Sequence, residues 1–157
     1  MEIFWNELTY GLPDRAHLET AILRVITAIV LGGVVGINRE RAGKPAGLRT
    51  HMLVSLGTAL VVLACSASNM SLEGQSRVIQ GIVTGIGFIG AGSILKLDKE
   101  REIQGLTTAA GLWMTAAVGV AVGLGALGVA IIGTLVALIV LGLEVIYSRR
   151  HERNKKA

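Results

Sequence analysis

The sequence predicts an all-α, polytopic membrane protein that crosses a lipid bilayer about five times, with its N-terminus outside and its C-terminus inside. Hydrophobic residues make up 52% of the 157-residue chain, and the mean hydropathy is +0.62. They gather in five stretches, each close to the ~20 residues that a helix needs to cross the hydrocarbon core. These stretches cover residues 18–37, 50–67, 78–95, 106–123 and 127–147.

The positions of the basic residues predict the orientation. With the N-terminus outside, twelve of the fifteen Lys and Arg residues fall in the inner connections and the C-terminal tail. These twelve are Arg39, Arg41, Lys44, Arg49, Lys96, Lys99, Arg101, Arg149, Arg150, Arg153, Lys155 and Lys156. Short cytoplasmic loops of membrane proteins carry such an excess of positive charge. Arg15 and Arg77 stay outside, and Arg24 lies within the first stretch.

Five spans use most of the chain, so the sequence divides into three parts. Residues 1–17 form an outer segment, residues 18–147 the transmembrane domain, and residues 148–157 a basic cytoplasmic tail. Phe4, Trp5 and Tyr10 either anchor the outer segment at the membrane surface or belong to a disordered tail. The formal charge of +4 is explained by loops that orient the helices and face anionic lipid, so no nucleic-acid partner is expected.

The first two stretches carry features that bear on packing. Gly32 and Gly36 have the small-xxx-small spacing that lets another helix approach closely. Arg24 lies about a turn and a half inside the first stretch, where it either snorkels to the outer surface or has a function. The lone Cys65 lies in the apolar second stretch and predicts a packed, inert thiol.

The third stretch has two unlike faces. On a helix, one face collects glycine and polar residues and the other collects aliphatic residues, so we expect the glycine face to pack against neighbouring helices. Its members include Arg77, Gln80, Gly81, Thr84, Gly85, Gly87, Ala91 and Gly92, with Phe88 as the one bulky residue. The run Gly85–Gly90 matches the dinucleotide pattern GxGxxG, but it lies inside an apolar span without the strand that this fingerprint requires. Helix packing is the expected role.

The last two stretches differ from each other. Gln104, Thr108, Gly111, Thr115 and Gly119 form a stripe on the fourth at three- and four-residue spacing, which predicts a second packing face. The fifth is aliphatic up to Glu144. That carboxylate either reaches the inner interface or pairs with Arg39 or Arg49.

A polar cluster is predicted at the inner membrane face. It contains one carboxylate, two guanidinium groups, an imidazole, amides and hydroxyls, which either form a specific binding pocket or act as helix caps and headgroup contacts. Its members are Asn38, Arg39, Glu40, Arg49, Thr50, His51, Gln104, Thr107 and Thr108. Arg77 with Gln80 forms a smaller outer pair. Acids at membrane depth are too few for an all-protein divalent-cation cage, although a hydrated Mg²⁺ held by Glu40 and hydroxyls stays open. No cofactor is implied, and no enzyme signature is present.

Three runs together resemble the MgtC/SapB family of bacterial inner-membrane proteins. They are GLRTHMLVSLGTAL (47–60), SRVIQGIVTGIGFIGAGSIL (76–95) and IQGLTTAAGLWMTAAVGVAVG (103–123). The resemblance also takes in residues 32–41 and implies a small five-helix membrane domain. Glu40, Arg49, Arg77, Gln80 and the glycines of 85–92 match the family, whereas His51 and Thr107 stand where a well-known member has Asn. The chain also ends before the soluble C-terminal domain of that member, as SapB-like members do.

The resemblance implies a role in adaptation to magnesium limitation and to acid or host-associated stress, including virulence. A regulator of other membrane proteins, such as the proton-translocating ATP synthase, is the first hypothesis. A transporter or channel for Mg²⁺ or a small solute is the alternative. The sequence has 21 glycines, which give several helices more close-packing surface than one small domain needs. This surplus predicts a homo-oligomer.

Overall fold

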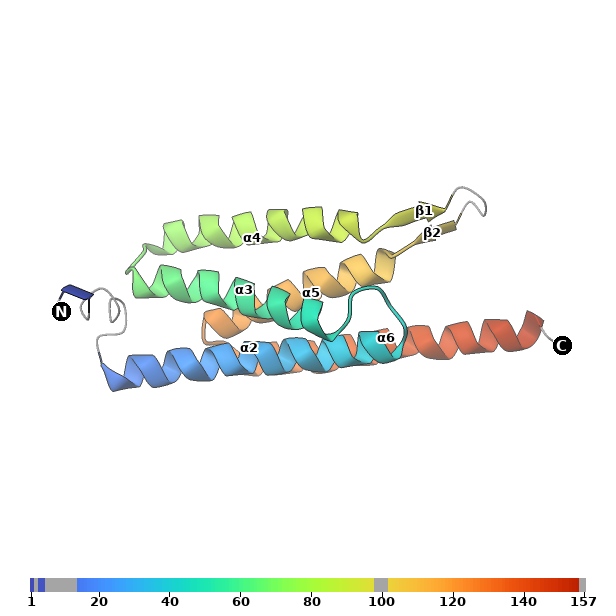
Figure 1. Ribbon diagram of the computed structural model, residues 1–157, viewed down its shortest axis with the longest axis horizontal. Helices are drawn as coiled ribbons and strands as arrows, with labels where there is room; N and C mark the ends of the chain where they lie inside the picture. Colours follow the sequence, from blue (N-terminus) through green and yellow to red (C-terminus); the bar gives the residue numbers. More distant parts are fainter. Residues whose placement is uncertain (2, 5–13, 98–101, 156–157) are drawn as a thin grey trace.

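Five long helices run along the length of the molecule in the described part of the chain (Figure 1). The computed structural model describes residues 1, 3–4, 14–97 and 102–155, and of these the side chains of 95–97, 102 and 144–155 are not described. The helices are α2 (Arg15–Arg41), α3 (Leu48–Ala67), α4 (Leu72–Gly92), α5 (Leu106–Gly123) and α6 (Leu127–Lys155). The prediction of an all-α membrane protein is confirmed. Trp5 and Tyr10 lie outside the described residues.

Four helices keep or extend the predicted stretches, whereas α4 begins six residues earlier and ends three residues earlier than the third stretch, 78–95, and Leu95 belongs to a strand. The fourth stretch has the same bounds as α5, whereas α2 is 27 residues long and α6 continues to Lys155. Among the described residues, α2, α3 and α5 are long and apolar enough to cross a membrane, and α6 contributes a shorter apolar part, Leu127–Leu143. The glycine and polar residues of α4 lower its hydropathy, although its 21 residues would span the hydrocarbon core.

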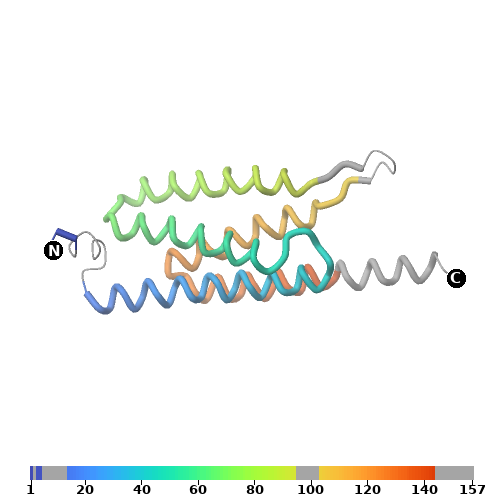
Figure 2. The backbone as a smooth tube through the Cα atoms, viewed as in Figure 1, coloured from blue at the N-terminus to red at the C-terminus, as the bar shows by residue number. Residues whose placement is uncertain are grey.

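The connections between helices alternate between two ends of the bundle (Figure 1). One end, here called the hairpin end, carries the 42–47 connection and a two-stranded hairpin made of β1 (Leu95–Leu97) and β2 (Glu102–Gln104). The opposite end, here called the amino-terminal end, carries the start of α2 and the 68–71 and 124–126 connections. The backbone trace in Figure 2 shows the same arrangement. The connections predicted to be cytoplasmic therefore share one end.

The hairpin was not expected from the sequence, which predicted a polar inner connection between the third and fourth stretches and no strands. Leu95 pairs with Gln104 and Leu97 with Glu102 in antiparallel register. A three-residue strand is too short to show a clear two-residue hydrophobic alternation, which is the signal that would have identified it.

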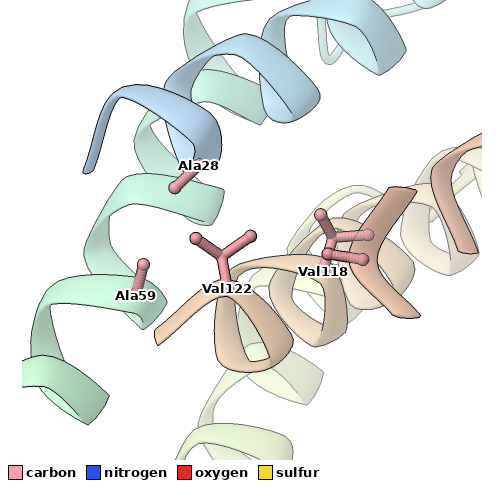
Figure 3. Close-up of a cluster of buried hydrophobic side chains, with 5 residues drawn as sticks. Ala28, Ala59, Val118 and Val122 are labelled. Atoms are coloured by element: carbon pink, nitrogen blue, oxygen red, sulfur yellow. The ribbon is translucent and has the colours of Figure 1, made fainter. Parts of the chain in front are cut away.

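Small residues bring α2, α3 and α5 into close contact. A Cβ atom added at Gly32 would lie 2.6 Å from the His51 carbonyl oxygen, and one at Gly36 would lie 2.6 Å from the Leu48 Cα. One added at Gly119 would collide with Thr58 Oγ1 and the Ser55 carbonyl. Beside these contacts Ala28, Ala59, Val118, Val122 and Ala130 form a buried core between four helices (Figure 3).

The predicted orientation of α4 is reversed within this chain. Ile86 and Gly90 are buried, and Val78, Ile79 and Ile82 are half-buried, so the aliphatic side faces the bundle. An added Cβ would meet nothing within 4 Å at the four glycines predicted to pack, namely Gly81, Gly85, Gly87 and Gly92. The physical reason is that Ile86 and its neighbours fill the space beside α3 and α5, which glycine would leave empty.

Candidate functional site

The hairpin end holds a buried polar cluster between α2, α3 and α5. Arg39 and His51 are 0% exposed and Thr108 is 2% exposed, so three of the nine residues predicted for the inner face are brought together in the interior. Each lies in the terminal turn of its helix that is nearest the hairpin end. Helix ends that meet at the same depth therefore position all three side chains.

The other six predicted members lie around this interior group. Glu40, Arg49, Thr50 and Gln104 are exposed, and Asn38 and Thr107 are half-buried. The Asn38 Oδ1 atom is itself buried and has no hydrogen-bond partner. The predicted cluster is therefore a buried group with a polar rim.

Arg39 joins α2 to α5. Its Nη2 atom donates to Thr108 Oγ1 at 3.4 Å, across 69 residues of sequence. A fully buried guanidinium is costly in an apolar interior unless hydrogen bonds surround it, so its neighbours are expected to be polar. The pairing of Glu144 with Arg39 or Arg49, considered from the sequence, lies outside the described side chains.

His51 joins α3 to α5. Its Nδ1 atom lies 2.7 Å from Thr115 Oγ1, and that oxygen lies 2.8 Å from the Gly111 carbonyl. The tautomer of the ring decides which atom of the His51–Thr115 pair donates. The Nε2 atom of His51 is buried without a hydrogen-bond partner.

Two further polar residues belong to the site and were not predicted. Ser55 is 0% exposed, lies one turn after His51 on α3, and its Oγ has no hydrogen-bond partner. Thr58 Oγ1 lies 3.2 Å from the Ala116 carbonyl of α5 and 3.0 Å from the Val54 carbonyl of its own helix. The spacing of His51, Ser55 and Thr58 at four and three residues was the available signal, because it aligns them on one helix face.

Glu40 has a structural task at the rim. Its Oε2 accepts a hydrogen bond from the Leu48 amide at 2.9 Å, at the first residue of α3. The N-cap residue of α3 is Gly47, which has no side chain to cap the helix. Glu40 therefore serves as the cap from the preceding helix, and its negative charge is favourable at a helix N-terminus.

The chemistry of the buried group is that of hydrogen-bond donors and hydroxyls. A guanidinium, an imidazole and four hydroxyl groups occupy it, and the described residues contain no cluster of three or more His, Cys, Asp and Glu that could hold a metal ion. Such a group can order water or polar solute atoms at His51 Nε2 and Ser55 Oγ, the two buried atoms on α3 that lack a hydrogen-bond partner. It also joins three helices at one depth.

The outer polar pair is not formed. Arg77 makes an ion pair with Glu73, one helical turn earlier on α4, and both side chains are largely exposed. Gln80 is exposed on the open face of the same helix. An i,i+4 pair of this kind contributes little to stability in water.

The sequence left open whether Arg24 snorkels to the outer surface or has a function. In the structure, its side chain reaches from α2 to α5. Its Nη1 donates to the carbonyl oxygen of Gly123 at 2.8 Å, so it caps the C-terminal end of α5. Gly125, with a φ of 83°, leaves the space that the guanidinium fills, since a Cβ there would lie 2.5 Å from Nη2.

Comparison with known proteins identifies the family. The sequence model of the MgtC family matches residues 25–149 of this chain. The chain is 40% identical to SrpB of Synechococcus elongatus over 75% of its length and 71% of that protein. It is 42% identical to YhiD of Escherichia coli K12 over 76% of its length, and 39% identical to MgtC of Salmonella typhimurium over 81%.

The match covers 58% of YhiD and 53% of MgtC, so the chain spans little more than half the length of these two relatives. No solved structure matches. The family match covers well over half of the sequence and includes α3, α4, α5 and the whole buried polar cluster, so the chain belongs to the MgtC family.

Proposed function

We propose that this chain is a non-enzymatic regulatory protein of the bacterial inner membrane, which acts by packing against a transmembrane helix of another membrane protein. The observation that carries the proposal is the open face of α4. This face, defined by Gln80, Gly81, Thr84, Gly85 and Phe88, is exposed, and nothing lies within 4 Å of a Cβ added at either glycine.

The composition of this face is unlike that of a surface built for lipid. Lipid-facing helix surfaces are aliphatic, because unpaired polar groups are costly in hydrocarbon. On α4 most of the aliphatic residues instead face the bundle, with Val83 and Ile89 exposed, and an amide and a hydroxyl face outward. A second helix on this face would supply partners for Gln80 and Thr84.

The geometry of the face favours close helix contact. Gly81 and Gly85 have four-residue spacing, which removes side chains along one line of the helix and lets two backbones approach. Phe88 is 86% exposed and stands next to this line, where it would fill a hollow on the partner. Interhelical hydrogen bonds in membranes are worth about 0.6 to 2 kcal/mol each, so this face would contribute specificity as well as affinity.

The physiological role rests on the family. The resemblance implies adaptation to magnesium limitation and to acid or host stress, and it makes the proton-translocating ATP synthase a candidate partner. A second copy of the chain is the other helix that this face could accept, in keeping with the expected homo-oligomer.

Photocrosslinking in native bacterial membranes tests the proposal. A crosslinking amino acid at position 88 should give one discrete adduct with another membrane protein. Gly85→Leu should abolish this adduct, because the leucine side chain would occupy the space through which a partner helix approaches. The matched control places the crosslinker at Ile139, which is 66% exposed on α6, and adds Gly142→Leu, where nothing lies within 4 Å. An adduct at twice the mass of the chain would assign the face to self-association, and lipid adducts alone at position 88 would refute it.

Magnesium transport is the second candidate function, because one relative, YhiD, has a name that proposes a magnesium transporter. Buried polar atoms of Asn38, His51 and Ser55 lack hydrogen-bond partners, and a permeating hydrated cation or solute would supply them. Flux measurements on the purified protein in liposomes distinguish the two functions. Magnesium flux that Glu40→Gln and Ser55→Ala abolish would favour transport, and no flux beside a crosslinked partner would favour regulation.

A further inference from the structure

A cleft of about 1080 Å³ opens at the amino-terminal end, between α2 and the second half of α3. Gly32 and Gly36 hold these two helices together at the hairpin end, whereas the cleft begins two turns earlier on α2, at Val25. The side chains that line it from α2 recur every three or four residues and therefore share one face. The cleft does not include α4, so it is independent of the function proposed above.

Among the described residues that line this cleft, Arg24 is the one with a guanidinium or ammonium group, and most of its hydrogen-bonding capacity is unused. A guanidinium has five N–H donors. The described residues take one of them, through Nη1 to the Gly123 carbonyl, and none of the described carboxylates pairs with Arg24. A single carbonyl does not neutralise a full positive charge in a half-buried site, so an anion is the missing partner.

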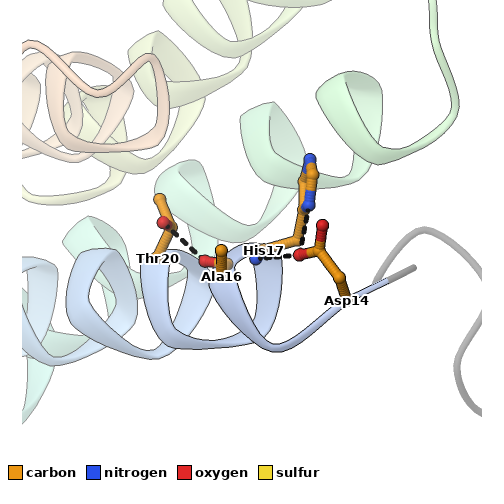
Figure 4. A network of polar contacts seen from close by, with 4 residues as sticks. All are labelled: Asp14, Ala16, His17 and Thr20. Carbon is orange, nitrogen blue, oxygen red and sulfur yellow. Dashed lines mark hydrogen bonds and ion pairs between the residues drawn. The ribbon is translucent and has the colours of Figure 1, made fainter.

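The hydroxyl groups that line the cleft do not donate hydrogen bonds to an anion. Thr20 donates to the Ala16 carbonyl, Ser66 to the Val62 carbonyl, and Ser68 to the Ala64 carbonyl. Each hydroxyl proton is therefore directed to the backbone of its own helix, and only oxygen lone pairs face the cleft. At the rim, His17 contacts Asp14 through Nδ1 (Figure 4). The charge available to an anion inside the cleft is that of Arg24.

The remaining walls are apolar, which narrows the chemistry of the anion. Val25, Leu60, Leu63, Ala64 and Leu124 line the cleft around the guanidinium. A ligand that fits both parts needs an anionic head and a hydrocarbon chain. A phospholipid has this combination.

The depth of Arg24 agrees with this ligand. The 27 residues of α2 extend about 40 Å, roughly 10 Å more than the hydrocarbon core. That excess is shared between polar residues at the two ends of α2, namely Arg15 and His17 before the predicted stretch of 18–37 and Arg39, Glu40 and Arg41 after it. Arg24 then lies six residues, or about 9 Å, inside the outer end of the stretch, a depth from which a long basic side chain can snorkel towards a lipid phosphate.

We propose that the cleft between α2 and α3 binds a phospholipid, with the lipid phosphate on the Arg24 guanidinium and one acyl chain along Leu60 and Leu63. The lipid would complete the charge pairing of Arg24 and fill a gap that separates two helices of the bundle. It would also connect the position of α2 and the end of α5 to the lipid composition of the membrane.

Thermal unfolding of the purified full-length protein in a neutral detergent tests this site. Dioleoyl phosphatidylglycerol should raise the unfolding temperature in a saturable way. In Arg24→Gln, which removes the positive charge, the lipid concentration for half of the maximal shift should rise about tenfold, as expected for one lost charge-assisted hydrogen bond. Arg77→Gln is the matched control, since it removes one positive charge at the same end outside the cleft, and its titration should equal that of the wild type.

A second variant separates lipid binding from the structural role of Arg24. Ala64→Trp fills the cleft and leaves Arg24 and its bond to Gly123 unchanged, and it should also abolish the saturable shift. Inorganic phosphate and dioleoylglycerol, added separately, should give no saturable shift. The proposal is overturned if Arg24→Gln and Ala64→Trp titrate like the wild type, or if inorganic phosphate alone stabilises the protein as much as the phospholipid does.

Discussion

Gly119 is a position where a single methyl group should decide the stability of the bundle. A Cβ added there would collide with Thr58 Oγ1 and with the Ser55 carbonyl, which is backbone and cannot move aside. We expect Gly119→Ala to destabilise the protein by about 1–3 kcal/mol, the range for overpacking a tight core. The measurement is thermal or denaturant unfolding in detergent.

The control for this prediction is Gly57→Ala, in the middle of α3. Nothing lies within 4 Å of a Cβ added at Gly57, and alanine favours a helix over glycine by about 1 kcal/mol. Gly57→Ala should therefore leave the stability unchanged or raise it. Equal effects of the two substitutions would show that α3 and α5 do not approach as closely at Gly119 as the structure has them.

Thr115 tests the hydrogen bond that joins His51 to α5. Thr115→Val keeps the shape of the side chain but removes the oxygen that lies 2.7 Å from His51 Nδ1. The buried Nδ1 atom would then lose its hydrogen-bond partner, which costs about 1–3 kcal/mol. Thr27→Val is the control, because Thr27 bonds only to the Leu23 carbonyl of its own helix. A Thr115→Val protein as stable as Thr27→Val would contradict this hydrogen bond.

At the scale of the element, the start of α2 should respond to pH. Asp14 accepts from the His17 amide at 2.8 Å, and this hydrogen bond, with the neighbouring His17 side chain, lowers the Asp14 pKa below its ordinary value of 3.8. A lowered folded-state pKa means that the capping contribution is complete above pH 3.8 and is lost as the pH falls through the folded-state pKa. The His17 amide signal in an NMR titration should therefore show a transition below that pH. Asp14→Asn, which caps without titrating, should remove that acid transition.

The element scale also shows what the sequence could and could not predict. Residues 106–123 were predicted to the residue, because their apolar run is bounded by Gln104 and by the glycines at 123 and 125. For α4 the sequence distinguished two faces, but hydrophobic patterns in a membrane do not tell which neighbour covers each, and within this chain it is the aliphatic face that lies against the bundle. Gly81 and Gly32 have the same local spacing, yet only Gly32 contacts another helix in this chain.

The candidate site was predictable in the same limited way. Arg39, His51 and Thr108 could be placed at one depth from the order of the spans. The burial of Ser55 and Thr58 depended on the rotation of α3 against α5, which Gly119 determines through a contact 58 or more residues away in sequence. The bond between Arg24 and Gly123 spans 99 residues and follows from the antiparallel return of α5 beside α2, which spacing alone does not show.

At the scale of the whole molecule, the alternation of connections between the two ends leads to a prediction of topology. The 42–47 connection lies at the hairpin end and the 68–71 connection at the amino-terminal end (Figure 1). The basic residues gather at the hairpin end, so we expect that end in the cytoplasm. Pro45→Cys and Met70→Cys, both at exposed positions, report the two ends in a Cys65→Ala background that removes the buried native thiol.

A membrane-impermeant maleimide added to intact spheroplasts should label Met70→Cys at once and Pro45→Cys only after the membrane is opened. Inverted vesicles should give the opposite order, which controls for intrinsic thiol reactivity. Labelling of Pro45→Cys in intact spheroplasts would place the buried cluster of Arg39, His51 and Thr108 at the outer surface. It would also move the Arg24 cleft to the inner leaflet, so the measurement determines which lipid pool Arg24 can reach.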